Sequence, residues 1–270
     1  GHRIMATKRV GDITRGTTAP NRLRRVDRWL IASYCSFLRS VEQPLCVDLG
    51  FGRSPATTVE WWQRLHAHVR DDIKVLGIEI DPQRVAAALP LARPGLEFAV
   101  GGFEIPSGNR QPHVIRAFNV LRQYPEAEVQ SAWTMMCRRL APGGVLIDGT
   151  CDEIGRLSTW LCVQADGERG AVPVTLTLSA QVSTLGEPSR FATRLPKSLI
   201  HRNVDGEPVH QLLAALDHAW ARNAGLAVFS ARQRFVATVQ QLQADGWPIC
   251  GSEQRWRLGE VTLDFQRLVQ

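Results

Sequence analysis

The stretch VDLGFGRSPATTVEW (47–61) decides the fold. An apolar strand pattern contains Asp48 near its end, Gly50 and Gly52 follow, and a helical pattern begins near Pro55. Glycines let a backbone turn tightly and approach a ligand, and the N-terminus of the next helix directs free N–H groups to the same point. The stretch therefore predicts a nucleotide-binding loop. Pro55 stands where the dinucleotide pattern G-x-G-x-x-G has its third glycine, which disfavours an NAD site.

Strand and helix patterns alternate on both sides of this loop. Strands are expected at 44–50, 73–80, 96–102, 113–120 and 144–150, and helices at 55–69, 81–92 and 125–141. This alternation predicts an α/β fold with a doubly wound, mostly parallel sheet. The patterns at 158–164 and 174–180 indicate a hairpin that adds an antiparallel edge and brings the expected sheet to seven strands.

Three regions are expected along the chain. Residues 1–43 form a basic N-terminal arm and a helix, and residues 44–185 form the ligand-binding α/β domain. Residues 186–270 read as a helical lid or substrate subdomain, with a final strand within 255–265.

The net charge of +6 is concentrated in the arm. Residues 1–28 contain eight Lys and Arg against two Asp, so the remaining 242 residues carry 24 basic and 24 acidic groups. A broad nucleic-acid-binding face would spread its charge over the body, so this pattern argues against one while leaving a basic arm that reaches a phosphate.

Other features limit the class of protein. We find no run of 18 apolar residues and no signal-peptide pattern, so a cytoplasmic protein without a membrane span is expected. The six cysteines form no C-x-x-C pair, which indicates reduced thiols and no metal site.

A second acidic residue strengthens the ligand prediction. Glu79 ends the second strand in VLGIEIDP, where a carboxylate can accept hydrogen bonds from both ribose hydroxyls. With CVDLGFGRSP, AFNVLRQY and RRLAPGGVLIDGT, this motif resembles the successive motifs of class I S-adenosylmethionine-dependent methyltransferases over about residues 44–151. The resemblance implies a Rossmann-like fold, S-adenosyl-L-methionine as cofactor and S-adenosyl-L-homocysteine as product.

On the methionine side of the cofactor, the resemblance implies five residues. Asp48, Gly50 and Gly52 would surround the methionine part, and Phe118 and Asn119 would lie near the amino group and the methyl.

On the adenosine side, the resemblance places Glu79 on the ribose and Ile80 against the adenine, with Gly102 and Phe103 at the adenine edge. The usual acid after the third strand is replaced by GGFE, so backbone N–H groups or Glu104 are the alternatives for holding the adenine.

Two arginines near the loop receive separate interpretations. Arg53 would meet the cofactor carboxylate or the substrate. Arg64 lies four residues after Glu60, a spacing that indicates a surface ion pair.

The methyl acceptor is predicted from the polar groups near the strand ends. Asp152 and Glu153 follow the fifth strand, and either could be the general base; a helix N-cap is the alternative role for Asp152. His201 lies in a polar loop and is the third candidate catalytic residue. The candidate substrate-binding residues are Arg122, Tyr124, Arg156, Arg202 and Asn203.

These groups favour O-methylation of a hydroxylated polar small molecule, such as a saccharide. An RNA methyltransferase that uses the basic arm is the runner-up, and a non-catalytic cofactor-binding protein is the second alternative. The arm itself is expected either to cover the cofactor or to be a solvated basic helix.

Overall fold

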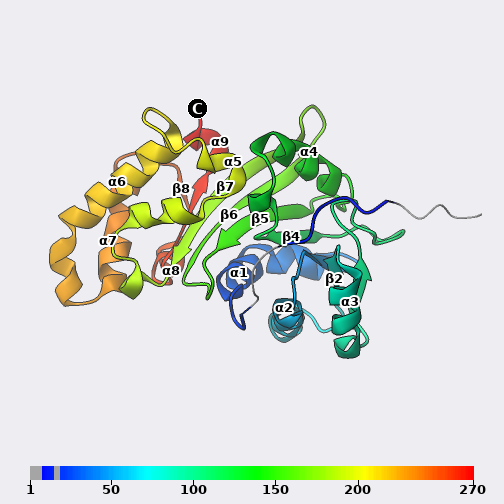
Figure 1. The fold of residues 1–270 in the computed structure, drawn as a ribbon. Coiled ribbons are helices and arrows are strands. Elements are labelled where there is room, and N and C mark those ends of the chain that lie inside the picture. Colours follow the sequence, from blue (N-terminus) through cyan, green and yellow to red (C-terminus); the bar gives the residue numbers. More distant parts are fainter. Residues whose placement is uncertain (1–7, 15–18) are drawn as a thin grey trace, which may run out of the picture.

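The computed structural model describes residues 8–14 and 19–270, and its centre is one mixed sheet (Figure 1). The strands follow the order β3-β2-β1-β4-β5-β6-β7-β9-β8. Their bounds are β1 (Leu45–Leu49), β2 (Lys74–Glu79), β3 (Leu96–Val100), β4 (Val114–Phe118), β5 (Val145–Cys151), β6 (Leu157–Asp166), β7 (Gly170–Ala180), β8 (Ile249–Cys250) and β9 (Glu260–Asp264). The first five strands in this order are parallel, and the other four pair antiparallel. The expected doubly wound, mostly parallel sheet core with an antiparallel edge is confirmed.

The strand count of seven was wrong. The described chain contributes nine strands because the C-terminal region returns to the sheet, where β9 pairs with β7 and the short β8 pairs with β9. A two-residue strand such as β8 is too short to leave a periodic pattern in the sequence.

Helices cover both faces of the sheet. The α-helices are α1 (Arg24–Ser40), α2 (Ala56–His68), α3 (Pro82–Ala88), α4 (Glu126–Cys137), α5 (Lys197–Ile200), α6 (Pro208–Arg222), α7 (Ala231–Ala244), α8 (Glu253–Trp256) and α9 (Phe265–Leu268). Five short 3-10 helices are η1 (Leu89–Leu91), η2 (Leu121–Gln123), η3 (Val182–Thr184), η4 (Pro188–Arg194) and η5 (Ala224–Val228).

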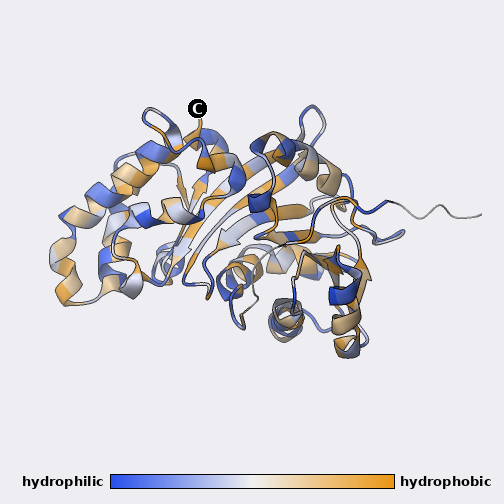
Figure 2. Cartoon of the chain, in the orientation of Figure 1, coloured by the Kyte–Doolittle hydropathy of each residue, from blue (hydrophilic) through white to orange (hydrophobic). Residues whose placement is uncertain are grey.

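The core lies on the two faces of the central strands. Every residue of β1, β4 and β5 is buried, as expected for parallel strands covered on both sides. One apolar cluster includes Trp61 and Trp160, and the other includes Trp133 and Phe235. Figure 2 shows the apolar residues concentrated along the strands and the polar residues on the outer surfaces of the helices.

The C-terminal region combines helices with sheet strands. Helices α6 and α7 pack on each other at the end of the molecule that carries β8 and β9 (Figure 1). Residues 186–270 therefore contain the expected helices and also extend the sheet itself. Over the described ranges, no helix has the length and apolar character needed to cross a bilayer.

Candidate functional site

The glycine loop follows β1 and requires glycine for two physical reasons. Gly50 and Gly52 have φ values of 72° and 82°, in the left-handed region that other residues rarely adopt. A Cβ on Gly50 would lie 2.7 Å from Cγ2 of Val120, and the Gly50 N–H donates to the carbonyl of Ile78 over 2.7 Å. The loop thus packs between the ends of β2 and β4. It forms the tight turn after β1 that its two glycines predict.

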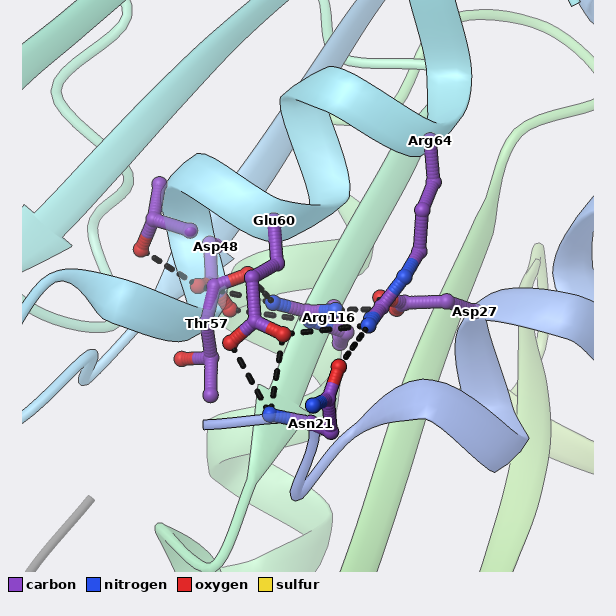
Figure 3. A network of polar contacts seen from close by, with 8 residues as sticks. Asn21, Asp27, Asp48, Thr57, Glu60, Arg64 and Arg116 are labelled. Atoms are coloured by element: carbon purple, nitrogen blue, oxygen red, sulfur yellow. Dashed lines mark hydrogen bonds and ion pairs between the residues drawn. The ribbon is translucent and has the colours of Figure 1, made fainter. Parts of the chain in front are cut away.

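Asp48 has a different role from the expected one. Its carboxylate accepts hydrogen bonds from Arg116 Nε at 3.0 Å and Nη2 at 2.9 Å, and from Thr58 Oγ1 at 2.7 Å. Figure 3 shows these groups converging beneath the start of α2. The Asp48 side chain is therefore used to hold Arg116 and α2, and it does not face a ligand beside the methionine part as the resemblance implied.

Arg116 lies at the centre of β4 and is fully buried. It also pairs with Asp27 of α1, and its guanidinium lies 4.2 Å from the centre of the Trp61 ring. Burial alone would lower the pKa of Arg116, but Asp27 and Asp48 outweigh it and raise that pKa, so the side chain stays charged. Sequence reasoning missed this network; the signal was an arginine inside the apolar run HVIRAFNV.

The expected ion pair between Glu60 and Arg64 exists, with a separation of 3.0 Å. Arg64 also bonds Asp27 at 2.7 Å, so this pair continues into the buried network (Figure 3). The network joins α1, α2, β1 and β4 directly beside the glycine loop.

A pocket lies beyond the carboxyl ends of β1, β2 and β3. It brings together six predicted residues, namely Gly50, Glu79, Ile80, Gly102, Phe103 and Tyr124. Tyr124, expected on the substrate side, therefore lines the same pocket as Glu79 and Phe103.

Glu79 is fully buried at the base of this pocket. Its carboxylate accepts from the backbone N–H of Asp81 at 2.6 Å and from Arg84 Nη1 at 3.0 Å. Beyond β3, the Gly102 N–H donates to both oxygens of Glu104, at 2.7 and 2.9 Å. The Glu79 carboxylate therefore lines the pocket, and the Glu104 carboxylate is bonded to Gly102, another residue of its lining.

The N-terminal segment, residues 9–14, fills this pocket. The Val10 N–H donates to Glu104 Oε1 at 2.8 Å, and the Val10 carbonyl accepts from the Phe103 N–H at 2.7 Å. The Asp12 N–H donates to the hydroxyl of Tyr124. A cavity of only about 20 Å³ remains.

The prediction that the arm covers the cofactor rested on residues 15–29, of which 15–18 lie outside the described residues. Arg22 and Arg25 of that stretch bond carbonyl groups of the turn after β5, and the segment in this pocket is the preceding residues 9–14.

Arg84 ties the segment to the pocket. It donates to Thr14 Oγ1 at 3.1 Å and to the Thr14 carbonyl at 2.9 Å while it pairs with Glu79. Arg9 donates to the carbonyl of Ile80 at 3.3 Å. The segment is thus bound by the same residues that were expected to bind the cofactor.

Phe118 points away from the pocket. A Cβ on Gly149 would lie 2.1 Å from the Phe118 ring, which packs in the apolar cluster with Trp160. The Phe118 side chain lies on the face of the sheet that carries Trp160, because side chains alternate between the two faces along β4. The expectation that Phe118 lies near the methyl is therefore wrong.

Asn119 ends β4 in a left-handed conformation with φ of 60°. Its N–H donates to the Gly149 carbonyl at 2.8 Å, and its Oδ1 accepts from the Cys151 N–H at 3.0 Å. Asn119 thus joins the carboxyl ends of β4 and β5.

The segment after β5 is a hairpin turn and does not begin a helix. Asp152 Oδ1 accepts from the Arg156 N–H at 2.8 Å, and the Asp152 N–H donates to the Leu157 carbonyl at 3.0 Å. Glu153 and Arg156 are exposed on this turn, and Arg53 is exposed on the glycine loop. Asp152 and Glu153 therefore lie beyond the carboxyl end of β5, as predicted, and the alternative of a helix N-cap is wrong.

His201, Arg202 and Asn203 do not belong to the site. Arg202 lines a separate cavity of about 410 Å³ together with Trp133 and Pro173. His201 and Arg202 are exposed, and Asn203 Oδ1 lies 3.1 Å from Nδ1 of His210.

Strand pairing explains why that loop is remote. Pro173 pairs with Val163, and Val163 pairs with Leu146 in the amino-terminal half of β5. The loop after α5 therefore lies toward the amino-terminal end of β5, whereas Asp152 follows the carboxyl-terminal end of that strand. The expectation that His201 and its neighbours contact the reacting groups is wrong, because sequence patterns do not tell at which sheet edge a long connection returns.

Sequence reasoning missed the contribution of η4. Arg122 Nη1 donates to Thr150 Oγ1 at 3.3 Å, and its Nη2 donates to the Thr193 carbonyl at 3.4 Å. Burial, followed by the nearby Arg194, lowers the pKa of Arg122. The predicted residue Arg122 therefore lies at the end of β5 beside two residues of η4 that had no assigned role.

No metal-binding group was found in the described part of the chain, in the sense of three or more His, Cys, Asp or Glu side chains close together. All six cysteines are free thiols.

Comparison with known proteins shows limited similarity. No family model matches the sequence, and no curated protein matches it. Magnesium protoporphyrin IX methyltransferase from Synechocystis PCC 6803, with bound SAH, is 18% identical over 48% of this chain and 54% of its own, with a TM-score of 0.36. An S-adenosylmethionine-dependent methyltransferase from Clostridium acetobutylicum ATCC 824 is 10% identical over 57% and 65%, with a TM-score of 0.35.

A pericyclic reaction enzyme gives a similar result, with 15% identity over 45% of this chain and 30% of its own and a TM-score of 0.38. The matched part of the chain thus spans between 30% and 65% of these structures. Sequence identities of 10–18% and TM-scores of 0.35–0.38 do not assign the activity of these proteins to this chain. The fold is therefore assigned from the arrangement of the sheet itself. The order β3-β2-β1-β4-β5 with helices on both faces is that of a Rossmann-like α/β fold.

Proposed function

We propose that this protein is an S-adenosylmethionine-dependent methyltransferase that acts on a polar small molecule. One observation carries the proposal. The pocket beyond β2 and β3 is lined by the buried Glu79 and by Phe103, whose N–H bonds the same residue, Val10, as the Glu104 carboxylate does.

The hydrogen-bonding groups of the pocket fit an adenosine. The Watson–Crick edge of adenine carries an N–H donor beside a ring-nitrogen acceptor. Glu104 and the N–H of Phe103 form the complementary pair, and here the N–H and carbonyl of Val10 satisfy both. The Glu79 carboxylate at the end of β2 would accept the ribose hydroxyls. Of the two alternatives for the adenine, the pocket supports the use of both backbone N–H and Glu104.

The acceptor would lie over the ends of β4 and β5. The cofactor supplies a methyl group already activated on a sulfonium. The chain must hold an acceptor oxygen in line and accept its proton. Arg122 beside Thr150 would bind polar groups of the acceptor, and Asp152 or Glu153 on the following turn would take the proton. These groups favour a hydroxylated acceptor such as a saccharide.

Cofactor binding requires the N-terminal segment to leave the pocket, because about 20 Å³ cannot hold an adenosine. We expect the segment to be displaced, since individual hydrogen bonds of residues 9–14, and no element of secondary structure, hold it.

Calorimetry tests the proposal with two proteins, the full chain and a form that lacks residues 1–14. Each is titrated with S-adenosylmethionine and, separately, with NAD. Saturable binding of S-adenosylmethionine without binding of NAD supports the proposal. Failure of both proteins to bind S-adenosylmethionine would overturn it.

A further inference from the structure

A second cavity, of about 230 Å³, lies between the start of α1, the turn after β5 and the ends of β7 and β9. Arg24, Arg25 and Arg28 of α1 line it together with Arg255 of α8, and we call it the arginine cavity. Arg255 forms an ion pair with Glu260 at 2.5 Å. No carboxylate of residues 8–14 and 19–270 forms an ion pair with the other three arginines.

Arg25 is the most buried of the three, and its hydrogen-bond acceptors are neutral oxygens, although the carboxylates of Glu260 and Asp152 also act on its charge. Its Nε donates to the Gly155 carbonyl at 3.2 Å, and its Nη1 donates to Ser179 Oγ and the Leu258 carbonyl, both at 3.3 Å. These groups satisfy hydrogen bonds without cancelling the charge. Burial, followed by the charges of Arg28 and Arg24, lowers the pKa of Arg25, as expected where positive charge accumulates.

The arrangement of these arginines brings like charges together at the start of α1, where Asp27, the acidic residue of the first turn, is paired with Arg116 and Arg64. Arg24 and Arg28 are four residues apart, a spacing at which like charges repel. Arg24 and Arg25 also occupy the first turn, where the helix dipole disfavours positive charge. The sequence stretches 1–7 and 15–18 contain no Asp or Glu that could supply a counter-charge.

We propose that the arginine cavity binds the phosphate group of a phosphorylated small molecule. Guanidinium groups match phosphate oxygens in geometry and in charge. The volume fits a phosphate with a small substituent and is below the usual range for larger organic ligands. An RNA chain needs an extended basic track, and the body of this protein is neutral. The proposal does not depend on methyl transfer, because the cavity shares no residue with the Glu79 pocket.

The test measures binding to the full chain without cofactor, by calorimetry at constant ionic strength. The probes are inorganic phosphate, glycerol 3-phosphate and, as the uncharged control, glycerol. We expect saturable binding of both phosphates and none of glycerol. The double variant Arg24→Gln/Arg28→Gln should bind at least tenfold more weakly. Arg138→Gln/Arg222→Gln removes the same charge from exposed positions outside the cavity and should bind like the original protein.

Two results would overturn the proposal. The first is the absence of saturable phosphate binding, or equal weakening in both double variants, which would indicate general charge attraction. The second is tighter binding of a single-stranded RNA oligomer than of glycerol 3-phosphate with a steep salt dependence, which would assign the arginines to nucleic acid.

If Arg24→Gln/Arg28→Gln does not fold, thermal unfolding of other forms of the protein still tests the proposal. Phosphate should raise the melting temperature of the unmodified protein above the value in chloride of equal ionic strength. Arg28→Gln alone, at an exposed position, should reduce that rise, and an undiminished rise would count against the cavity.

Discussion

The carbonyl of Val10 accepts a hydrogen bond from the backbone N–H of Phe103 over 2.7 Å. The N–H of the same residue donates to Glu104 at 2.8 Å. A residue from the N-terminal segment thus presents a donor and an acceptor to the groups proposed to bind adenine. The N-terminal segment and the adenine of the cofactor would therefore compete for the Glu104 carboxylate and the Phe103 N–H.

Replacing Val10 by proline should tighten the binding of S-adenosylmethionine. Proline has no N–H, so the bond to Glu104 is lost while the carbonyl remains. A hydrogen bond to a charged group contributes about 1.5–3 kcal/mol, which corresponds to roughly tenfold or more in affinity. Calorimetry would measure the change. Lys8→Pro is the control, since no hydrogen bond of its N–H was found in the described structure. Weaker binding in Val10→Pro would show that the segment assists the cofactor.

Gly102→Ala should expel the N-terminal segment. A Cβ at this position would lie 1.8 Å from the carbonyl oxygen of Val10, too close for any accommodation. Trypsin should then cleave after Arg9 faster than in the original protein, because a bound segment resists proteolysis. Gly225→Ala, where a Cβ meets nothing within 4 Å, should leave the cleavage rate unchanged. Equal rates in all three proteins would show that the segment is not held in the pocket.

Glu79→Ala should weaken the binding of S-adenosylmethionine by about 1.5–3 kcal/mol, since hydrogen bonds to a charged group are lost. The control Glu97→Ala removes an exposed carboxylate from the neighbouring strand. Calorimetry on both variants in the form without residues 1–14 separates this effect from that of the segment. An affinity unchanged by Glu79→Ala would remove this residue from the site.

Arg116→Met should reduce the free energy of unfolding by about 3–5 kcal/mol, because it leaves the buried Asp48 carboxylate without a cation and the buried Asp27 carboxylate with Arg64 alone. Arg64→Met, which removes a partly exposed partner of Asp27, should have a smaller effect. Urea unfolding of both variants gives the comparison. Equal losses would show that the buried pairs contribute no more than the peripheral one.

The stability of the protein should depend on pH through Asp148. Burial raises the pKa of Asp148 to about 7, although Trp133 Nε1 donates to its carboxylate at 2.9 Å. In the unfolded chain the pKa is about 3.9. The folded protein therefore keeps a proton that the unfolded chain has lost, so this stabilisation is complete below pH ~4 and is lost as the pH rises toward 7.

The matched variant is Asp148→Asn, which retains an oxygen for Trp133 and does not titrate. Relative to this variant, the original protein should lose a few kcal/mol of unfolding free energy between pH 4 and 7. Parallel pH profiles of the two proteins would contradict a raised pKa.

How far the sequence predicts the site depends on how local each feature is. The glycine loop follows β1 and Glu79 ends β2, as the sequence predicts, because each position depends only on the end of its own strand. The side chain of Phe118 was misplaced, since its face depends on the exact phase of β4. Asp48 was assigned to the ligand because nothing in its own stretch indicates that Arg116 binds it.

The sequence by itself determined the parallel core of the sheet, the glycine loop and the acidic residue at the end of β2, because these depend on local periodicity and on short turns. Only the tertiary structure decided which long-range partners meet. In the folded chain Val10 bonds Phe103, and Arg116 is buried between Asp27 and Asp48. The loop that contains His201 lies away from the carboxyl ends of the central strands, and the arginines of α1 and α8 line one cavity. These contacts join residues that are far apart along the chain, and only the packing of the whole fold brings such residues together.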